Sequence, residues 1–174
     1  MIAAISVVIV LIGGLLIYAA TRPDEFRVER SMAISAPPDR VFSSINDFRL
    51  WTGWSPWEKI DPELKRSYSG AASGRGAIYE WEGNNKAGKG RMEITETSSP
   101  SRVLIKLDFE KPFKANNMVE FVLESAGDST KVTWSMTGRS PFMMKVMGIL
   151  MNMDRMVGGD FEKGLANLKA LAEK

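Results

Sequence analysis

The segment RVLIKLDFE (102–110) alternates apolar and polar side chains along most of its length. Val103, Ile105 and Leu107 fall on one side, and the charged residues fall on the other. A period of two residues is typical of a β-strand with one face in a core and the other in water. The same alternation recurs in TKVTWSMTG (130–138). We therefore expect a sheet with one buried face.

Further strands are predicted on both sides of that segment. Turns containing Gly, Asn, Ser and Pro separate them, and no helical period intervenes in the middle of the chain. Two short helices are expected after the first strand, and Pro37 and Pro38 open the first of them. The predicted strands are residues 26–35, 64–69, 77–82, 89–98, 102–110, 117–125 and 130–138. Consecutive strands with short turns predict an antiparallel meander.

A change of period marks the C-terminal part of the chain. From Pro141 onward, apolar residues recur every three or four positions, which predicts one long amphipathic helix. Gly158 and Gly159 interrupt the pattern and mark a bend or a close approach to the sheet. A curved sheet wrapped around this helix would leave a pocket between them. The predicted fold class is α+β.

An uncharged run rich in Ile, Val and Leu extends from Ile2 to Ala20. As a helix it would rise roughly 28 Å, close to the ~30 Å hydrocarbon thickness of a bilayer. We expect an uncleaved, single-pass transmembrane anchor over residues 1–22 and one domain over residues 23–174. Arginines after the run weakly favour a cytoplasmic domain. A cleaved signal peptide and a buried helix are the alternatives, but no basic residue precedes the run as a signal peptide requires.

The composition excludes several classes of function. Lys and Arg number 23 and Asp and Glu number 21, and without a basic cluster we expect no nucleic-acid partner. The chain has no His and no Cys, which excludes a Ser-His-Asp triad, a thiolate nucleophile and a zinc hydrolase site. We expect no catalytic residues, no metal and no cofactor. No dimerisation motif is present in the apolar run, so a monomer is the default.

Five segments together resemble the SRPBCC superfamily of START and pollen-allergen proteins, and most closely its polyketide cyclase/dehydrase and lipid transport branch. The opening A-P-x-x-V-[FW] pattern followed by D-x-x-x-W-x-x-W carries most of the resemblance. The segments are ISAPPDRVFSSINDFRLWTGWSPW (34–57), YSGAASGRGAIYEWEG (68–83), GRMEITETSSPSRVLIKLDFEKPF (90–113), KVTWSMTG (131–138) and MVGGDFEKGLANLKAL (156–171). The resemblance implies a helix-grip fold, with seven antiparallel strands around a C-terminal helix and a hydrophobic cavity. It leaves the function open, because members of this superfamily carry ligands, cyclise polyketides or activate chaperones.

Alternation and helical spacing indicate which side chains would line that cavity. Tryptophan combines an apolar face with one hydrogen-bond donor, and methionine adapts to apolar ligands of varied shape, although both also serve as plain core packing. The candidate lining residues are Trp54, Trp57, Tyr79, Trp81, Met92, Ile105, Leu107, Phe121, Trp134, Met147, Leu150 and Met153. Asp154 and Arg155 are interpreted as surface charges on the helix.

Three functions are compatible with these features. The first is a membrane-tethered, noncatalytic binder or carrier of a hydrophobic, lipid-like small molecule. The second is a polyketide cyclase or dehydratase, which would need an acid and a base inside the cavity. The third is a protein-interaction module of the chaperone-activator type, with the tryptophan loop or the outer face of the sheet as its contact surface.

Overall fold

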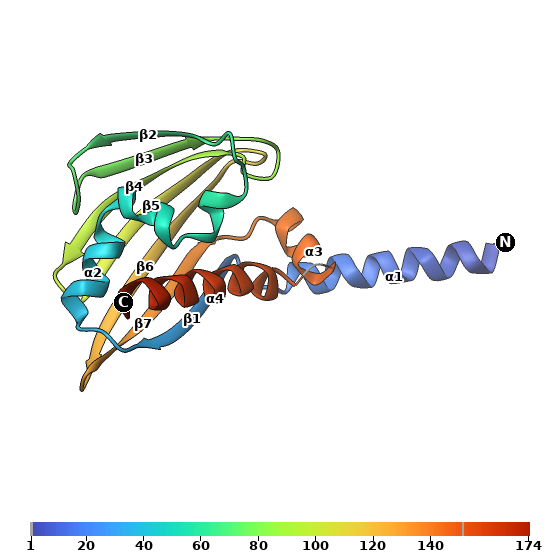
Figure 1. The fold of residues 1–174 in the computed structure, drawn as a ribbon. Helices are drawn as coiled ribbons and strands as arrows, with labels where there is room; N and C mark the ends of the chain where they lie inside the picture. The colour runs from blue at the N-terminus through green and yellow to red at the C-terminus, as the bar shows by residue number, and fades with distance from the viewer. Residues whose placement is uncertain (1, 151) are drawn as a thin grey trace.

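Seven antiparallel strands form one curved sheet in the order β1-β7-β6-β5-β4-β3-β2 (Figure 1). The computed structural model describes residues 2–150 and 152–174. The strands are β1 (Glu25–Ile34), β2 (Lys65–Gly70), β3 (Ala77–Glu82), β4 (Lys89–Ser98), β5 (Arg102–Lys111), β6 (Ala115–Ala126) and β7 (Ser129–Arg139). The meander from β2 to β7 is confirmed, and β1 completes the sheet by pairing with β7.

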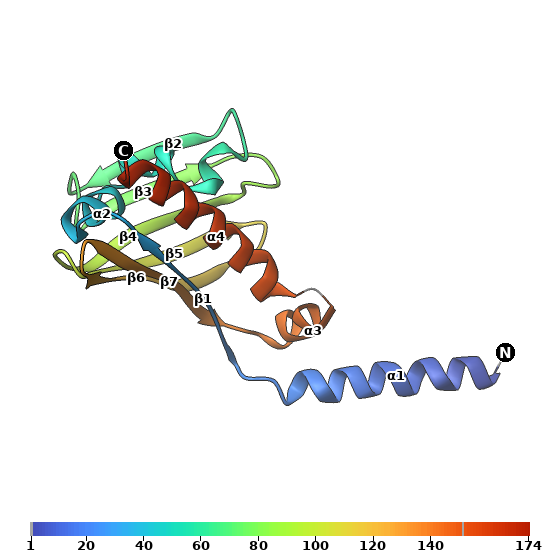
Figure 2. The same cartoon turned by 60° about the horizontal axis from the view of Figure 1, so that its bottom comes forward.

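Alternating burial along the strands gives the sheet one apolar face. In β5, Val103, Ile105 and Leu107 are buried, and the residues between them are more exposed. β3 and β7 follow the same rule, and their buried side chains point to the same side as those of β5. This face curves around helix α4 (Met153–Ala172), as Figure 2 shows. The predicted helix-grip arrangement of sheet and C-terminal helix is confirmed.

Short helices connect β1 to β2 and cover one end of the sheet. They are the α-helix α2 (Pro38–Asn46) and the 3-10 helices η1 (Phe48–Gly53) and η2 (Pro56–Lys59). The sequence predicted two short helices here, and the structure has three. Proline lies in the first turn of both α2 and η2, where its missing N–H removes no hydrogen bond.

The predicted single C-terminal helix is two helices, α3 (Phe142–Leu150) and α4. Asn152 is the N-cap of α4, and its side-chain oxygen accepts a hydrogen bond from the backbone N–H of Arg155 at 2.9 Å. An N-cap inside an apolar helical pattern does not change the pattern, so periodicity alone missed the break. Gly158 and Gly159 lie within α4, and a Cβ at Gly158 would collide with the side chain of Arg30 on β1. The predicted close approach to the sheet is thus confirmed at Gly158.

The apolar run forms helix α1 (Ile2–Ala20), which extends away from the sheet and contacts α3 near its C-terminal end (Figure 1). Among the residues that the structure describes, no helix is both long and apolar enough to cross a membrane. The predicted transmembrane anchor is therefore wrong, and so is the predicted membrane localisation. The expectation rested on the length and the uncharged composition of the run alone, and these two properties do not by themselves place a helix in a bilayer. The division of the chain at residue 22 stays a prediction.

Candidate ligand cavity

A cavity of about 360 Å³ lies between the concave face of the sheet and α4. This volume is near the lower end of the range for small-molecule pockets, about 300–1,000 Å³. Side chains from β3 to β7, from η1, η2 and the chain after them, from the β3–β4 turn and from α4 line it. They are Trp51, Ser55, Trp57, Glu58, Ile60, Leu64, Tyr79, Trp81, Lys86, Ala87, Met92, Leu107, Phe109, Val119, Trp134, Met136, Met156, Val157, Asp160 and Phe161.

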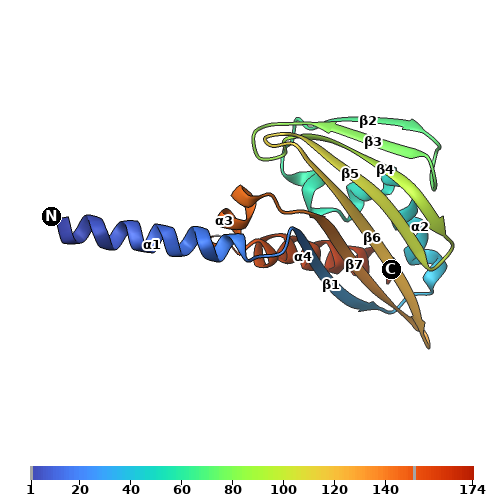
Figure 3. The ribbon, with the colours of Figure 1, turned by 180° about the vertical axis from the view of Figure 1, so that it is seen from behind.

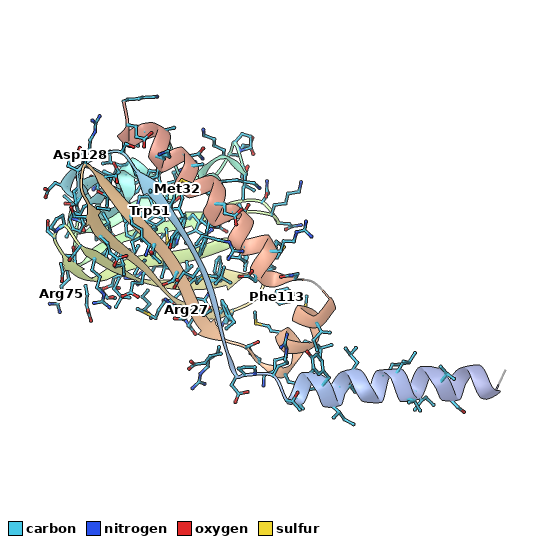
Figure 4. All side chains as sticks on the ribbon, turned by 90° about the horizontal axis from the view of Figure 1, so that it is seen from below. Arg27, Met32, Trp51, Arg75, Phe113 and Asp128 are labelled. Atoms are coloured by element: carbon cyan, nitrogen blue, oxygen red, sulfur yellow. The ribbon has the colours of Figure 1, made fainter. Side chains whose placement is uncertain are left out.

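Aromatic rings in mutual contact form a large part of the wall. Trp134 of β7 stacks on Phe161 of α4 with ring centroids 4.3 Å apart and nearly parallel planes. Trp57 of η2 meets the same two rings edge-on, at 5.5 Å from Trp134 and 6.0 Å from Phe161. Trp51 of η1, which is labelled in Figure 4, meets Phe121 and Trp134 of the sheet edge-on. These contacts join the sheet, the short helices and α4 around one apolar space.

One charged residue, Glu58, is buried in this apolar wall with only 8% of its surface exposed. The hydroxyl of Tyr79 donates to Glu58 Oε1 at 2.6 Å, and Arg66 Nε donates to Glu58 Oε2 at 2.6 Å. Arg66 also donates through Nη2 to the backbone oxygen of Glu58, at 2.8 Å, and through Nη1 to that of Leu64, at 3.0 Å. The carboxylate is thus paired and hydrogen-bonded, as a buried charge must be.

Local hydrogen bonds hold the loop that carries Glu58. Pro56 occupies the first turn of η2 and fixes its backbone angle there. The carboxylate of Asp61 accepts from the backbone N–H of Glu63 at 3.0 Å and from that of Asn84 at 2.6 Å, which ties the loop to the β3–β4 turn. On the other side, the amide of Asn167 in α4 donates to the backbone oxygen of Trp54 at 3.0 Å. Glu58 therefore has a fixed position relative to both walls.

The ionisation of this cluster follows from its burial. Burial raises the pKa of Tyr79 far above its ordinary value of 10, and the hydrogen bond to Glu58 raises it further. The hydrogen bond to Glu58 also raises the pKa of Arg66. At neutral pH Tyr79 is a neutral donor and Arg66 is a cation. Tyr79 therefore cannot act as a base in this setting.

Two further polar groups lie in the wall without a partner among the described residues. Ser55 is 3% exposed and lines the cavity, and no hydrogen bond of its hydroxyl is found there. The indole nitrogen of Trp134 is buried and also has no hydrogen-bond partner. Within residues 2–150 and 152–174, no group of acidic side chains comes together in a way that could hold a metal ion.

Six of the twelve predicted lining residues border the cavity: Trp57, Tyr79, Trp81, Met92, Leu107 and Trp134. Trp54, Ile105 and Phe121 point to the same side of the fold but are packed in the core. Met147 lies on α3 and is 46% exposed, because the helix breaks before α4. The side chains of Leu150 and Met153 lie outside the described part of the chain. That any of these residues binds a ligand stays a prediction.

Sequence reasoning missed Glu58, which directly follows Trp57 in a loop without any strand or helix period. One signal was available for a contact between β1 and α4, because Arg30 breaks the alternation of β1. Its side chain pairs with Asp154 at 3.0 Å and with Glu162 at 2.7 Å, both on α4. Asp154 lies at the surface as interpreted, but it also links α4 to the sheet.

Residues 25–173 match the protein family described as polyketide cyclase / dehydrase and lipid transport. The chain belongs to this family. No curated protein matches the chain.

Solved structures share the architecture of this polyketide cyclase / dehydrase and lipid transport domain. A protein from Chromobacterium violaceum is 16% identical, with a TM-score of 0.61 and coverage of 88% of this chain and 99% of its own. One from Nitrosospira multiformis is 21% identical, with a TM-score of 0.61 and coverage of 84% and 96%. DynU16, a protein of the dynemicin biosynthetic locus, is 16% identical with a TM-score of 0.59, and the match covers 88% of this chain and 48% of DynU16. At these identities the likeness concerns the fold alone.

Proposed function

We propose that this domain binds a hydrophobic small molecule in the cavity between the sheet and α4 and holds it without catalysing a reaction. The supporting observation is a cavity of about 360 Å³ whose wall is dominated by aromatic and aliphatic side chains. Membership of a family that includes lipid transport is consistent with this role. Burial of apolar ligand surface would supply the binding free energy, at about 25 cal/mol per Å².

The test compares two methionine-to-tryptophan substitutions on neighbouring strands. Met136 lines the cavity, whereas Met118 lies on the opposite face of the sheet. We expect Met136→Trp to narrow the space and weaken binding of the neutral dye Nile red at least about tenfold, because the indole is bulkier than the thioether that it replaces. Met118→Trp should bind the dye like the parent chain. Fluorescence titration measures both, and equal binding by the two variants would contradict the proposal.

A reaction in the cavity is the second candidate, since Glu58 and Tyr79 are an ionisable pair inside it. Acid–base catalysis needs one group that can give a proton and one that can take it near the substrate. Here the hydroxyl of Tyr79 already donates to Glu58, and Arg66 occupies the other carboxylate oxygen. Binding is therefore the better-supported function. Recovery of a chemically altered ligand would favour catalysis instead.

Trp54 does not support the alternative in which the tryptophan loop is a contact surface for a protein partner. Trp54 is 1% exposed, and its indole nitrogen donates to the backbone oxygen of Ser44 at 3.0 Å. A side chain buried in this way does not offer a contact surface to a partner.

A further inference from the structure

We propose that the cavity selects an apolar molecule carrying a neutral hydroxyl group, and that this hydroxyl donates a hydrogen bond to the carboxylate of Glu58. The inference rests on the proposed function, because it names the chemical class of the same ligand. A cavity with this preference would bind single-chain or compact alcohols more tightly than fatty acids or amines.

Glu58 has unused hydrogen-bonding capacity. An ionised carboxylate offers about four lone-pair positions. The described residues fill one on each oxygen, from Tyr79 and from Arg66. Glu58 is buried and lines the cavity, so the remaining positions face protein or ligand rather than bulk water. A donor on the ligand would therefore gain a hydrogen bond to a charged acceptor, which is stronger than one between neutral groups.

The surroundings of Glu58 disfavour an anionic head group on the ligand. The hydroxyl of Tyr79 has its proton directed to Glu58, and Arg66 donates to Glu58 and to the backbone oxygen of Leu64. These donors are engaged within the protein. A ligand carboxylate placed here would face a like charge, which is unfavourable at a buried site. Lys86 also lines the cavity, but from an exposed position on the β3–β4 turn.

Arg66 disfavours a cationic head group on the ligand. Arg66 already balances the charge of Glu58 at 2.6 Å. A ligand ammonium beside the carboxylate would also approach the guanidinium, and the two cations would repel each other at low dielectric. A neutral hydroxyl has neither penalty. It can also accept a hydrogen bond from the hydroxyl of Ser55, which lines the same cavity.

The volume limits the apolar part of the ligand. A space of about 360 Å³ admits one alkyl chain or a compact ring system, but not the two acyl chains of a phospholipid. A twelve-carbon alcohol is therefore a suitable probe.

The experiment measures displacement of Nile red from the full chain by four ligands built on a twelve-carbon chain: 1-dodecanol, its methyl ether, dodecanoate and dodecylamine. All are used below the concentrations at which they aggregate. We expect dodecanol to displace the dye at a concentration at least about tenfold lower than the other three, since a hydrogen bond to a charged group corresponds to about that factor. The methyl ether is the matched control, because it keeps the oxygen as an acceptor and has a methyl group in place of the hydroxyl hydrogen.

Two outcomes would overturn the inference in distinguishable ways. If the ether, the acid or the amine competes as well as the alcohol, the hydroxyl preference is wrong while dye binding still supports a hydrophobic ligand. If neither the dye nor any of the four ligands binds, the proposed function fails and this inference fails with it.

Variants locate the preference at the carboxylate. Glu58→Gln should reduce the preference for dodecanol over its methyl ether several-fold. Glu63→Gln, at an exposed position of the same loop, should leave this preference unchanged. Tyr79→Phe preserves the pair between Glu58 and Arg66, and it provides the test if Glu58→Gln does not fold. Because Tyr79→Phe removes a competing donor, we expect this variant to keep or increase the preference for dodecanol over its methyl ether. Loss of the preference in Tyr79→Phe would assign it to the tyrosine hydroxyl and overturn the inference.

Discussion

Gly158 and Gly159 are neighbours in α4, yet their surroundings differ. A Cβ at Gly158 would collide with the guanidinium of Arg30, whereas a Cβ at Gly159 would meet no described atom within 4 Å apart from its chain neighbours and the backbone of its own helix. In a helix interior, alanine is more favourable than glycine by up to about 1 kcal/mol. We expect Gly159→Ala to raise the free energy of unfolding by up to this amount. Gly158→Ala should give no gain, because Arg30 must leave its two carboxylate partners. Urea denaturation measures both changes.

A second background shows whether Arg30 causes the difference between the two glycines. In a chain that carries Arg30→Ala, the side chain that blocks the Cβ at Gly158 is absent. Gly158→Ala should then be as favourable as Gly159→Ala, within about 0.5 kcal/mol. A persistent difference would mean that another contact of Gly158 determines its cost.

Glu58 shows the limit of prediction at the scale of single residues. Strand alternation placed Tyr79 and Trp81 on the buried face, because a period of two fixes the face of every residue in a strand. Glu58 belongs to a four-residue 3-10 helix, where no such period exists. Its burial depends on Arg66 and Tyr79, which follow 8 and 21 residues later. Only the assembled sheet brings these partners to the carboxylate.

At the scale of elements, Arg30 of β1 pairs with Asp154 and Glu162 of α4. Figure 2 shows the ribbons of β1 and α4 as neighbours. The hydrogen bond from Arg30 holds the pKa of Asp154 below its ordinary value of 3.8. A lowered pKa contributes stability that is present above the unfolded-state value and lost as the pH falls through the folded-state value. We expect Arg30→Met to lower the free energy of unfolding by a constant amount above about pH 4, and the difference to shrink at lower pH. Urea denaturation between about pH 2 and 7 checks this.

Arg155 offers a matched control for that measurement. It lies next to Asp154, it is exposed, and within the described residues it makes no ion pair. Arg155→Met should therefore change stability little and show no such dependence on pH. The ion pair is mostly solvent-exposed at Asp154, so the expected effect of Arg30→Met is modest. A difference that grows as the pH falls would contradict the assigned role of Arg30.

The elements themselves were well predicted where a period was long and uninterrupted. All seven strands were expected within two residues of their observed ends, because each alternates or is bounded by turn residues. The break between α3 and α4 was missed. Apolar residues continue in phase across it, and the decisive feature is a cap at Asn152 rather than a change of pattern. Local polar chemistry therefore decided what periodicity left open.

At the scale of the whole molecule, the same apolar face serves as both core and cavity wall. Trp134 packs on Phe161 and also borders the cavity, whereas Phe121 on the adjacent strand is fully buried. Alternation predicts which side of the sheet a residue faces, but the distance between sheet and helix decides whether a space remains there. Figure 3, seen from behind, shows how strongly the sheet curves. This curvature explains why half of the predicted lining residues border the cavity while others lie in the core.

The arrangement of α1 leads to a prediction about the entire chain. Of the α1 side chains that the structure describes, only Ala19 is buried, and the helix contacts α3. Removal of residues 1–22 should therefore change the free energy of unfolding of the remaining domain by no more than about 1 kcal/mol, roughly the value of burying one methyl group. Asp24 and its ion pair with Lys145 of α3 remain in the shortened chain. Urea denaturation of both chains at several protein concentrations separates this effect from self-association. A loss of several kcal/mol would mean that α1 contributes to the core of the domain.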